Sequence, residues 1–374
     1  MPSEKVLASG LVERIGQASG KLHYKSEAFS TSEEMEIADH SVALKEVTKH
    51  LMHKDYGVIK DPAEIPAIGH RVVHGGASFS DTIIIDEQVK SKIKQLFSLA
   101  PLHNPPNLKG IEVAEEIFPQ AKQVAVFDTA FHQTIPAPAN RYAIPNKFYE
   151  EDHIQVYGFH GTSHKYVSEK ANEFLGKKES NLVTVHLGNG CSITAVKNGK
   201  SVDHSLGFGP VNGLIMGTRS GDIDQSVIFY LIEKFGYTAK EVSDLLHHQS
   251  GMLGLTGYSD LRDIEEQAEK GNKTCQLALE MNTYRIKKYI GSYAAAMNGL
   301  DAVVFTAGIG ENSDVIRKLV CKDMDYLGLQ LDDEKNSQRS KDIRSIGKEN
   351  SKVQILVIPT NEELEIAKQT VAML

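Results

Sequence analysis

Several features that mark other protein classes are scarce in this 374-residue sequence. Its three cysteines, at positions 191, 275 and 321, are too few and too scattered for a disulfide framework or a Cys-x-x-Cys metal site. No apolar run approaches the roughly 18 residues that cross a membrane, and the opening MPSEKVLASG contains no apolar signal region. We therefore expect a soluble protein of a reducing compartment, the cytoplasm.

Long basic stretches are also missing. The chain has 41 Lys and Arg against 49 Asp and Glu, a formal charge of −8, so we expect neither nucleic acid nor a membrane surface as a partner. Apolar residues make up 41% and charged residues 24%, which is ordinary globular composition. The length predicts two domains, with a boundary near residues 129–150, ahead of the loop-rich TIPAPANRYAIPNKF.

Helical and strand patterns alternate along the chain, which predicts an α/β fold. Apolar spacing predicts helices over residues 32–54, 107–117, 225–235 and 274–298. Four short apolar runs read as strands and end in small, polar or glycine-rich turns: 125–127, 182–187, 302–305 and 355–358. Ligands bind beyond the carboxyl ends of strands in open α/β sheets, so these four turns suggest a phosphate and metal site.

The stretch HLGNGCSITAVKNGKSVDHS (186–205) reads as a strand end, a turn, a strand, an Asn-Gly turn and another strand. The segment VLASG (6–10) matches only the last part of such a unit. The pattern raises the question of whether the first copy of a duplicated phosphate-binding unit is missing ahead of it.

Two arginines lie beside glycines. Arg71 in GHRVVHGG and Arg219 in PVNGLIMGTRSGDID could form a converging clamp for carboxylate or phosphate oxygens. The alternatives are a surface arginine near a turn for Arg71, and an ion pair between Arg219 and Asp222 or Asp224.

The segment YGFHGTSH (157–164) contains His160 and His164, four residues apart. This spacing could bind zinc on one helix face. A loop that enters a helix capped by Thr or Ser, with one histidine bonding a charged oxygen, is the favoured reading.

Acidic and glycine-rich turns complete the set of candidate motifs. Asp128 in VFDTAFH and Glu362 in TNEELEIAK could serve Mg²⁺, although Asp128 could instead cap a turn. Thr360 and Glu363 fit a capping box, which would leave Glu362 for ligands. AGIGENS (307–313) reads as a glycine turn that lets backbone amides approach a nucleotide.

Taken together, these segments resemble the acetokinase family. The resemblance spans about residues 6–374 and is carried, in family order, by GHRVVHGG, SLAPLHNPPN, FDTAFH, YGFHGTSH, HLGNGCS, MGTRSGDID, AGIGENS and PTNEELEIA. It implies the fold group of sugar kinases, actin and heat-shock ATPases, with two domains of duplicated sheet cores and the active-site cleft between them. The domains would be residues 1–129, completed by a C-terminal helix 361–374, and a nucleotide-binding domain 130–360.

The resemblance further implies Mg²⁺-dependent, reversible phosphoryl transfer from ATP to acetate by a homodimer, with Mn²⁺ able to replace Mg²⁺. Arg71 and Arg219 would hold the acetate carboxylate and the phosphoryl group in flight, and His160 would hydrogen-bond that group. Asp128 would be catalytic and, with Glu362, would organise the metal. The acetate methyl pocket would comprise Val73, Leu102, Phe159 and Pro210, with His103 nearby. The nucleotide would contact His186, Leu187, Gly188, Asn189, Gly190, Asp260, Leu261, Arg262, Gly308, Ile309, Gly310, Glu311 and Asn312.

This chain departs from the family pattern at its start, where a strand ending in Asn-Ala-Gly-Ser-Ser-Ser is usual. Two alternatives therefore stand beside acetate phosphorylation. One is a kinase of propionate or another short-chain carboxylate with the same machinery. The other is a truncated nucleotide-binding paralogue with little activity.

Overall fold

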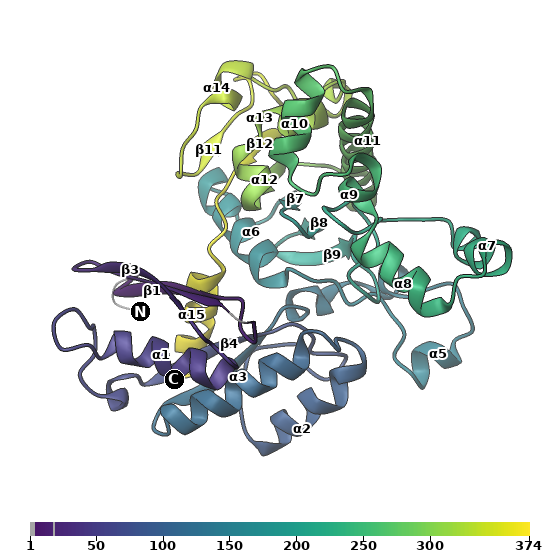
Figure 1. The fold of residues 1–374 in the computed structure, drawn as a ribbon. Helices are drawn as coiled ribbons and strands as arrows, with labels where there is room; N and C mark the ends of the chain where they lie inside the picture. The colour runs from purple at the N-terminus through teal and green to yellow at the C-terminus, as the bar shows by residue number, and fades with distance from the viewer. Residues whose placement is uncertain (1–3, 18) are drawn as a thin grey trace. The chain divides into compact units, whose positions relative to one another are not determined.

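The computed structural model describes residues 4–17 and 19–374 (Figure 1). They form two compact units, Met1–Ala130 together with Glu363–Leu374, and Phe131–Glu362. The chain therefore leaves the first unit, builds the second, and returns to the first with its last helix, α15 (Glu362–Ala372). The first three residues of the opening segment lie outside the described residues.

The first unit begins with an antiparallel sheet of β1 (Ala8–Glu13), β2 (Gly20–Ser26) and β3 (Ser30–Met35). Leu22 and Tyr24 of β2 alternate with polar residues and pack against Ile37 and helix α1 (His40–Leu51). The helix predicted over residues 32–54 is thus only partly present, and its first residues form β3. Exposed and half-buried positions alternate along β3, which is the period of a strand, and the carboxylate of Asp39 caps α1 at the amide of Val42.

A second sheet in this unit has the order β4-β6-β5. Strands β4 (Ala67–Val72) and β6 (Lys122–Phe127) are parallel, and β5 (Ile83–Ile84) is antiparallel to β6. Helices α2 (Glu87–Gln95) and α3 (Asn104–Ile117) contribute apolar side chains to its core. Gly69 of β4 allows α15 to approach closely, because a side chain there would collide with Ile366 and Thr370.

The second unit contains a six-stranded mixed sheet of order β11-β12-β10-β7-β8-β9. Strands β7 (Asn181–Leu187), β8 (Cys191–Lys197) and β9 (Lys200–His204) form an antiparallel meander, which confirms the alternation predicted for residues 186–205. Strands β10 (Ala302–Thr306) and β12 (Gln354–Val357) run parallel to β7, and β11 (Arg344–Ser345) is an antiparallel edge. The four predicted apolar runs are therefore strands.

Helices surround this sheet. Helix α6 (Gly161–Leu175) packs Val167 and Ala171 against the strand core, and the predicted helices 107–117, 225–235 and 274–298 are confirmed as α3, α7 (Gln225–Phe235) and α11 (Lys273–Met297). The remaining helices are α4 (Ala137–Asn140), α5 (Lys147–Glu150), α8 (Ala239–His248), α9 (Gly251–Thr256), α10 (Leu261–Glu269), α12 (Ala307–Asn312), α13 (Asp314–Cys321) and α14 (Asp333–Ser337). In the described part of the chain, no helix is both long and apolar enough to cross a membrane.

Candidate active site

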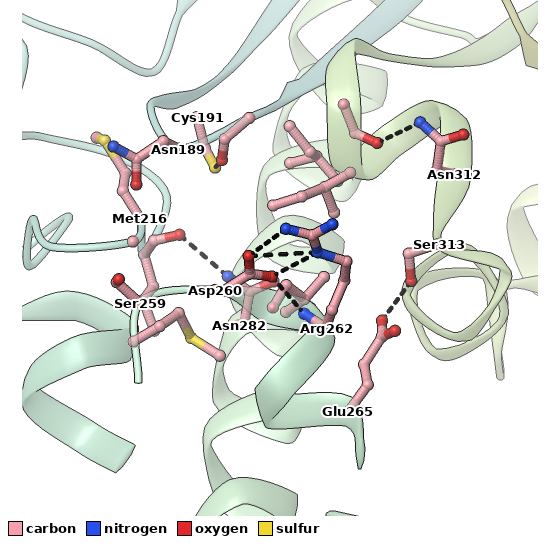
Figure 2. A pocket seen from close by; sticks show the side chains of 18 of the residues that line it. Asn189, Cys191, Met216, Ser259, Asp260, Arg262, Glu265, Asn282, Asn312 and Ser313 are labelled. Carbon is pink, nitrogen blue, oxygen red and sulfur yellow. Dashed lines mark hydrogen bonds and ion pairs between the residues drawn. The ribbon is translucent and has the colours of Figure 1, made fainter. Parts of the chain in front are cut away.

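A pocket of about 800 Å³ opens in the second unit, beyond the carboxyl ends of β7 and β10 (Figure 2). Nine of the residues expected to contact a nucleotide line it, and they come from three separate segments: Leu187, Gly188, Asn189, Asp260, Leu261, Arg262, Gly308, Ile309 and Asn312. Strands β7 and β10 are parallel neighbours, so the segments that follow them emerge at the same edge of the sheet. The fold thus gathers residues that lie more than a hundred positions apart in the sequence.

One wall of the pocket is a charged pair at the start of α10. The carboxylate of Asp260 caps the helix at the amide of Arg262 and accepts from the Arg262 guanidinium at 2.6, 3.0 and 3.2 Å (Figure 2). This guanidinium lowers the pKa of Asp260 to about 2. Asp260 is therefore a carboxylate at neutral pH, able to accept hydrogen bonds from a bound sugar or base.

Sequence reasoning missed other residues of this pocket, including Cys191, Ile215, Met216, Met252, Ser259, Glu265, Asn282 and Arg339. Ile215 and Met216 lie within the motif that contains Arg219, so that motif supplied a usable signal. Asn282 gave none, because it is one position in the regular pattern of α11. Its side chain donates to the carbonyl of Ile215 at 3.0 Å and thereby fixes the pocket floor.

The prediction of a glycine turn at residues 307–313 is wrong, because β10 passes directly into α12. Ala307 makes the sharp change of direction with φ +64°. The carbonyls of Gly310 and Glu311 accept from the buried Arg317, whose pKa is lowered to about 10 by burial. These two residues, although expected to contact the nucleotide, are not among those that line the pocket.

Next to the pocket, His160 and Arg219 converge on the turn between β7 and β8. A methyl group placed on Gly190 would lie 3.5 Å from Nε2 of His160 and 3.7 Å from Nη1 of Arg219. Gly188 and Asn189, immediately before Gly190, line the pocket itself. An imidazole and a guanidinium therefore face one point at the end of the pocket, an arrangement suited to a multiply charged anion.

The backbone of His160 explains how its ring reaches this point. The predicted Thr or Ser cap is absent from α6, since the residue before its first turn is His160 itself, in the left-handed region at φ 56° and ψ 27°. Thr162 and Ser163 lie inside the helix. A left-handed conformation is unfavourable for histidine and persists only where the surroundings enforce it.

The suggested ion pair of Arg219 with Asp222 or Asp224 is not what the structure shows. Nη1 of Arg219 donates to the carbonyl of Pro210 at 2.9 Å. Asp222 accepts from the amide of Gly213 and the hydroxyl of Tyr289, both at 2.7 Å, and Asp224 caps α7. Both aspartates thus shape the loop, and the guanidinium is directed towards Gly190.

The zinc alternative for His160 and His164 also finds no support in the geometry. Nδ1 of His164 contacts the hydroxyl of Thr184 and Nε2 contacts that of Ser192, both at 2.7 Å. Both ring nitrogens are thus engaged by hydroxyls. Burial, with the nearby His132, lowers the pKa of His164 well below its usual value, so the ring is neutral.

Five predicted residues belong to the first unit: Arg71, Val73, Leu102, His103 and Asp128. Arg71 is in β4 itself and not in a turn, and its Nη2 donates to Oδ2 of Asp128 at 2.7 Å. The Asp128 carboxylate is almost fully buried, whereas the Arg71 side chain is 40% exposed. Val73 is buried just beyond the strand, Leu102 is 70% exposed, and His103 precedes α3.

Two further predicted residues belong to the second unit. Phe159 is buried, and its amide donates to Nε2 of His204 at 3.1 Å. Glu362 is the first residue of α15. Just before it, the amide of Thr360 donates to the carboxylate of Glu311, which ties this turn to α12.

Comparisons with known proteins point in one direction. The model of the acetokinase family matches residues 1–368. The acetate kinase of Flavobacterium johnsoniae is 61% identical over 374 residues, covering 100% of this chain and 95% of that protein. The acetate kinase of Thermotoga maritima is 52% identical over 375 residues, covering 99% and 93% respectively. These coverages do not support the expectation that the chain is truncated.

Two solved structures are similar over nearly the whole chain. The crystal structure of Porphyromonas gingivalis acetate kinase has a TM-score of 0.93 at 45% identity, covering 99% of this chain and 94% of that one. A propionate kinase from Francisella tularensis has a TM-score of 0.92 at 43% identity, with the same coverage.

Proposed function

The chain belongs to the acetokinase family, and we propose that its site catalyses reversible transfer of the terminal phosphoryl group of ATP to acetate, giving acetyl phosphate and ADP. The observation that carries this proposal is the convergence of His160 and Arg219 on Gly190, at the end of a pocket large enough for a nucleoside phosphate. A guanidinium and an imidazole at that point suit the negative oxygens of a phosphoryl group.

In this mechanism the adenosine lies along the α10 and α12 walls, and the phosphates point towards the β7–β8 turn. An acetate oxygen attacks the terminal phosphorus in line while the bond to the ADP oxygen breaks, so no proton has to be removed from the nucleophile. Catalysis then consists of positioning and of neutralising charge on the transferred group. Arg219 and His160 serve that group, and Arg71 is the proposed partner of the acetate carboxylate.

Mg²⁺ is the metal this family implies, and the available donors fit it. Asp128 and Glu362 offer carboxylate oxygens, which are the ligands Mg²⁺ prefers, and Mg²⁺ usually takes only one or two from the protein. The described residues contain no cluster of three or more His, Cys, Asp or Glu side chains that could hold a metal. In this part of the chain, no metal site is therefore formed by such side chains alone. When bound, the ion would neutralise phosphate charge, with Asp128 and Glu362 each a candidate for the one protein carboxylate that such a site needs.

The strand order of the six-stranded sheet indicates the fold group to which the second unit belongs. Its strands run β9-β8-β7-β10-β12, an antiparallel meander continued by parallel strands. We propose that this is one copy of the duplicated core of the sugar kinase, actin and heat-shock ATPase fold group. The two sheets of the first unit, one antiparallel and one mixed, would represent the other copy.

Activity and substrate size can be tested together. We expect the purified protein with ATP, Mg²⁺ and acetate to form acetyl phosphate, trapped as the hydroxamate, with a lower kcat/KM for propionate. If the buried Val73 faces the acetate methyl, Val73→Ala makes room for one methylene and raises the propionate-to-acetate ratio of kcat/KM about 10-fold.

Ala114→Gly, a buried change on α3 away from the proposed pocket, controls for general loosening. A wild-type protein that phosphorylates neither acid would refute the proposed function. An unchanged ratio in Val73→Ala would remove only Val73 from the substrate pocket.

We also propose that the protein is a homodimer through the apolar surface of α7. No residue of this helix is buried, although it carries Val227, Phe229, Tyr230 and Phe235, which are 40–61% exposed. Figure 1 shows α7 set apart from the six-stranded sheet. An apolar helix without a buried face is expected to pack against another surface.

The expected result is a dimer in light scattering, converted to monomer by Phe229→Asp combined with Phe235→Asp, because charges in an apolar interface are strongly unfavourable. Phe174→Asp, on an exposed position of α6, is the matched control and leaves the mass unchanged. A double variant that remains dimeric would place the interface elsewhere.

A further inference from the structure

A chain of hydrogen bonds leads from His160 into the interior of the second unit. Nδ1 of His160 contacts Oγ of Ser192 at 2.8 Å, and the same hydroxyl contacts Nε2 of His164 at 2.7 Å. Nδ1 of His164 then contacts the hydroxyl of Thr184 at 2.7 Å. Ser192, His164 and Thr184 are fully buried and come from β8, α6 and β7 respectively.

We propose that Ser192 and His164 are positioning residues, which hold the imidazole of His160 so that its Nε2 presents a hydrogen to the transferred phosphoryl group. This inference rests on the proposed function. It adds two residues that touch neither substrate and act only through His160.

The ring of His160 needs such a contact to distinguish its two edges. It stacks on the ring of His186, with centroids 4.4 Å apart and planes inclined by 16°. Stacking fixes the plane of a ring but not which edge faces which neighbour. A half-turn about the bond to Cβ would exchange Nε2 with a carbon, and the hydrogen bond to Ser192 opposes that turn because a carbon at the Nδ1 position cannot replace it.

The proton arrangement follows from the neutrality of His164. A neutral imidazole has one donor nitrogen and one acceptor nitrogen. When it bonds two hydroxyls, it accepts from one and donates to the other, so the direction of one hydrogen bond sets the direction of the next. If Thr184 donates to Nδ1 of His164, then Nε2 of His164 donates to Ser192, and Ser192 donates to Nδ1 of His160. The remaining hydrogen of a neutral His160 then lies on Nε2, on the side of Gly190 and Arg219. His160 can thus donate without carrying a charge of its own.

Kinetics of matched variants test the proposal. Ser192→Ala should lower kcat about 10- to 100-fold with the KM for ATP nearly unchanged, because a misplaced catalytic group loses rate more than binding. Ser192→Thr keeps the hydroxyl and should recover part of kcat. Thr194→Ala is the control: Thr194 is fully buried on the same strand, and its hydroxyl bonds Nδ1 of His204 at 2.7 Å.

Thr194→Ala should lower Tm as much as Ser192→Ala and leave kcat close to wild type. Equal losses of kcat in the two variants would reduce Ser192 to a structural role and overturn the proposal.

A second measurement needs neither a variant nor turnover. Nitrogen NMR of the wild-type protein labelled at histidine should show His160 protonated at Nε2 and His164 neutral at neutral pH. A proton only on Nδ1 of His160 would reverse the chain and contradict the proposal. A protein that shows the expected tautomers but makes no acetyl phosphate would refute the proposed function while leaving the hydrogen-bond chain intact.

Discussion

Replacing Arg219 by alanine should lower kcat about 10²–10³-fold, the usual cost of losing one preorganised contact to developing charge. The guanidinium faces the end of the pocket and is held there by the carbonyl of Pro210. In the proposed mechanism, Arg219 binds a group whose charge is redistributed during transfer, so its loss should affect the transition state more than the ground state. We expect a small change in the KM for ATP.

Two variants test whether the loss of kcat is caused by losing the paired N–H donors of the guanidinium. Arg219→Lys keeps the charge but not the paired donors, and should stay well below wild-type kcat. Arg141→Ala removes an exposed arginine of the same unit that stacks on Tyr149, with its guanidinium carbon 3.8 Å from the ring centroid, and should leave kcat unchanged. Wild-type kcat in Arg219→Ala, measured by coupled assay, would exclude Arg219 from the transfer step.

The second large effect is expected from the smallest possible change, Gly190→Ala. The added methyl would meet atoms of His160 and Arg219 at 3.5–3.7 Å, which are ordinary van der Waals separations, and the φ of Gly190 is not in the left-handed region. The fold should therefore tolerate it. The methyl would nevertheless fill the point on which both side chains converge, and a displacement of about 1 Å there can cost about 10²-fold in kcat.

The informative comparison is with Gly110→Ala, a helical glycine of α3 where an added methyl has nothing within 4 Å. That variant should keep kcat and gain up to about 1 kcal/mol of stability, because alanine favours a helix over glycine. If Gly190→Ala matched wild type in both kcat and Tm, the phosphoryl group would have to pass elsewhere.

The fold of the second unit was largely predictable because its strands are apolar runs closed by glycine and asparagine turns. The Asn198-Gly199 turn, with positive φ at both residues, is a clear example. The first sheet was harder. In β3 the sequence STSEEM has no apolar face of its own before Met35, and only its pairing with β2 makes it a strand. Local pattern cannot reveal such a partner.

The site was predictable where a turn brings glycine and a charged residue together, as at Arg219 and Gly190. It was not predictable where a helix contributes one polar position to a distant loop, as Asn282 does. His164 shows the same limit. Its spacing from His160 suggests a shared helix face, but His160 lies before the first turn of α6. Only the assembled sheet shows that Ser192 and Thr184 stand opposite His164.

The return of α15 to the first unit has a consequence for how the protein is made. A ribosome synthesises residues 363–374 only after the whole of the second unit, yet they belong to the first. Gly69 of β4 therefore stays uncovered until some three hundred later residues have been synthesised and Ile366 can pack against it. The second unit is continuous and can fold during translation. Pairing across so long a stretch of chain is slow, so we infer that the nascent first unit is the part of the molecule most exposed to proteases and chaperones.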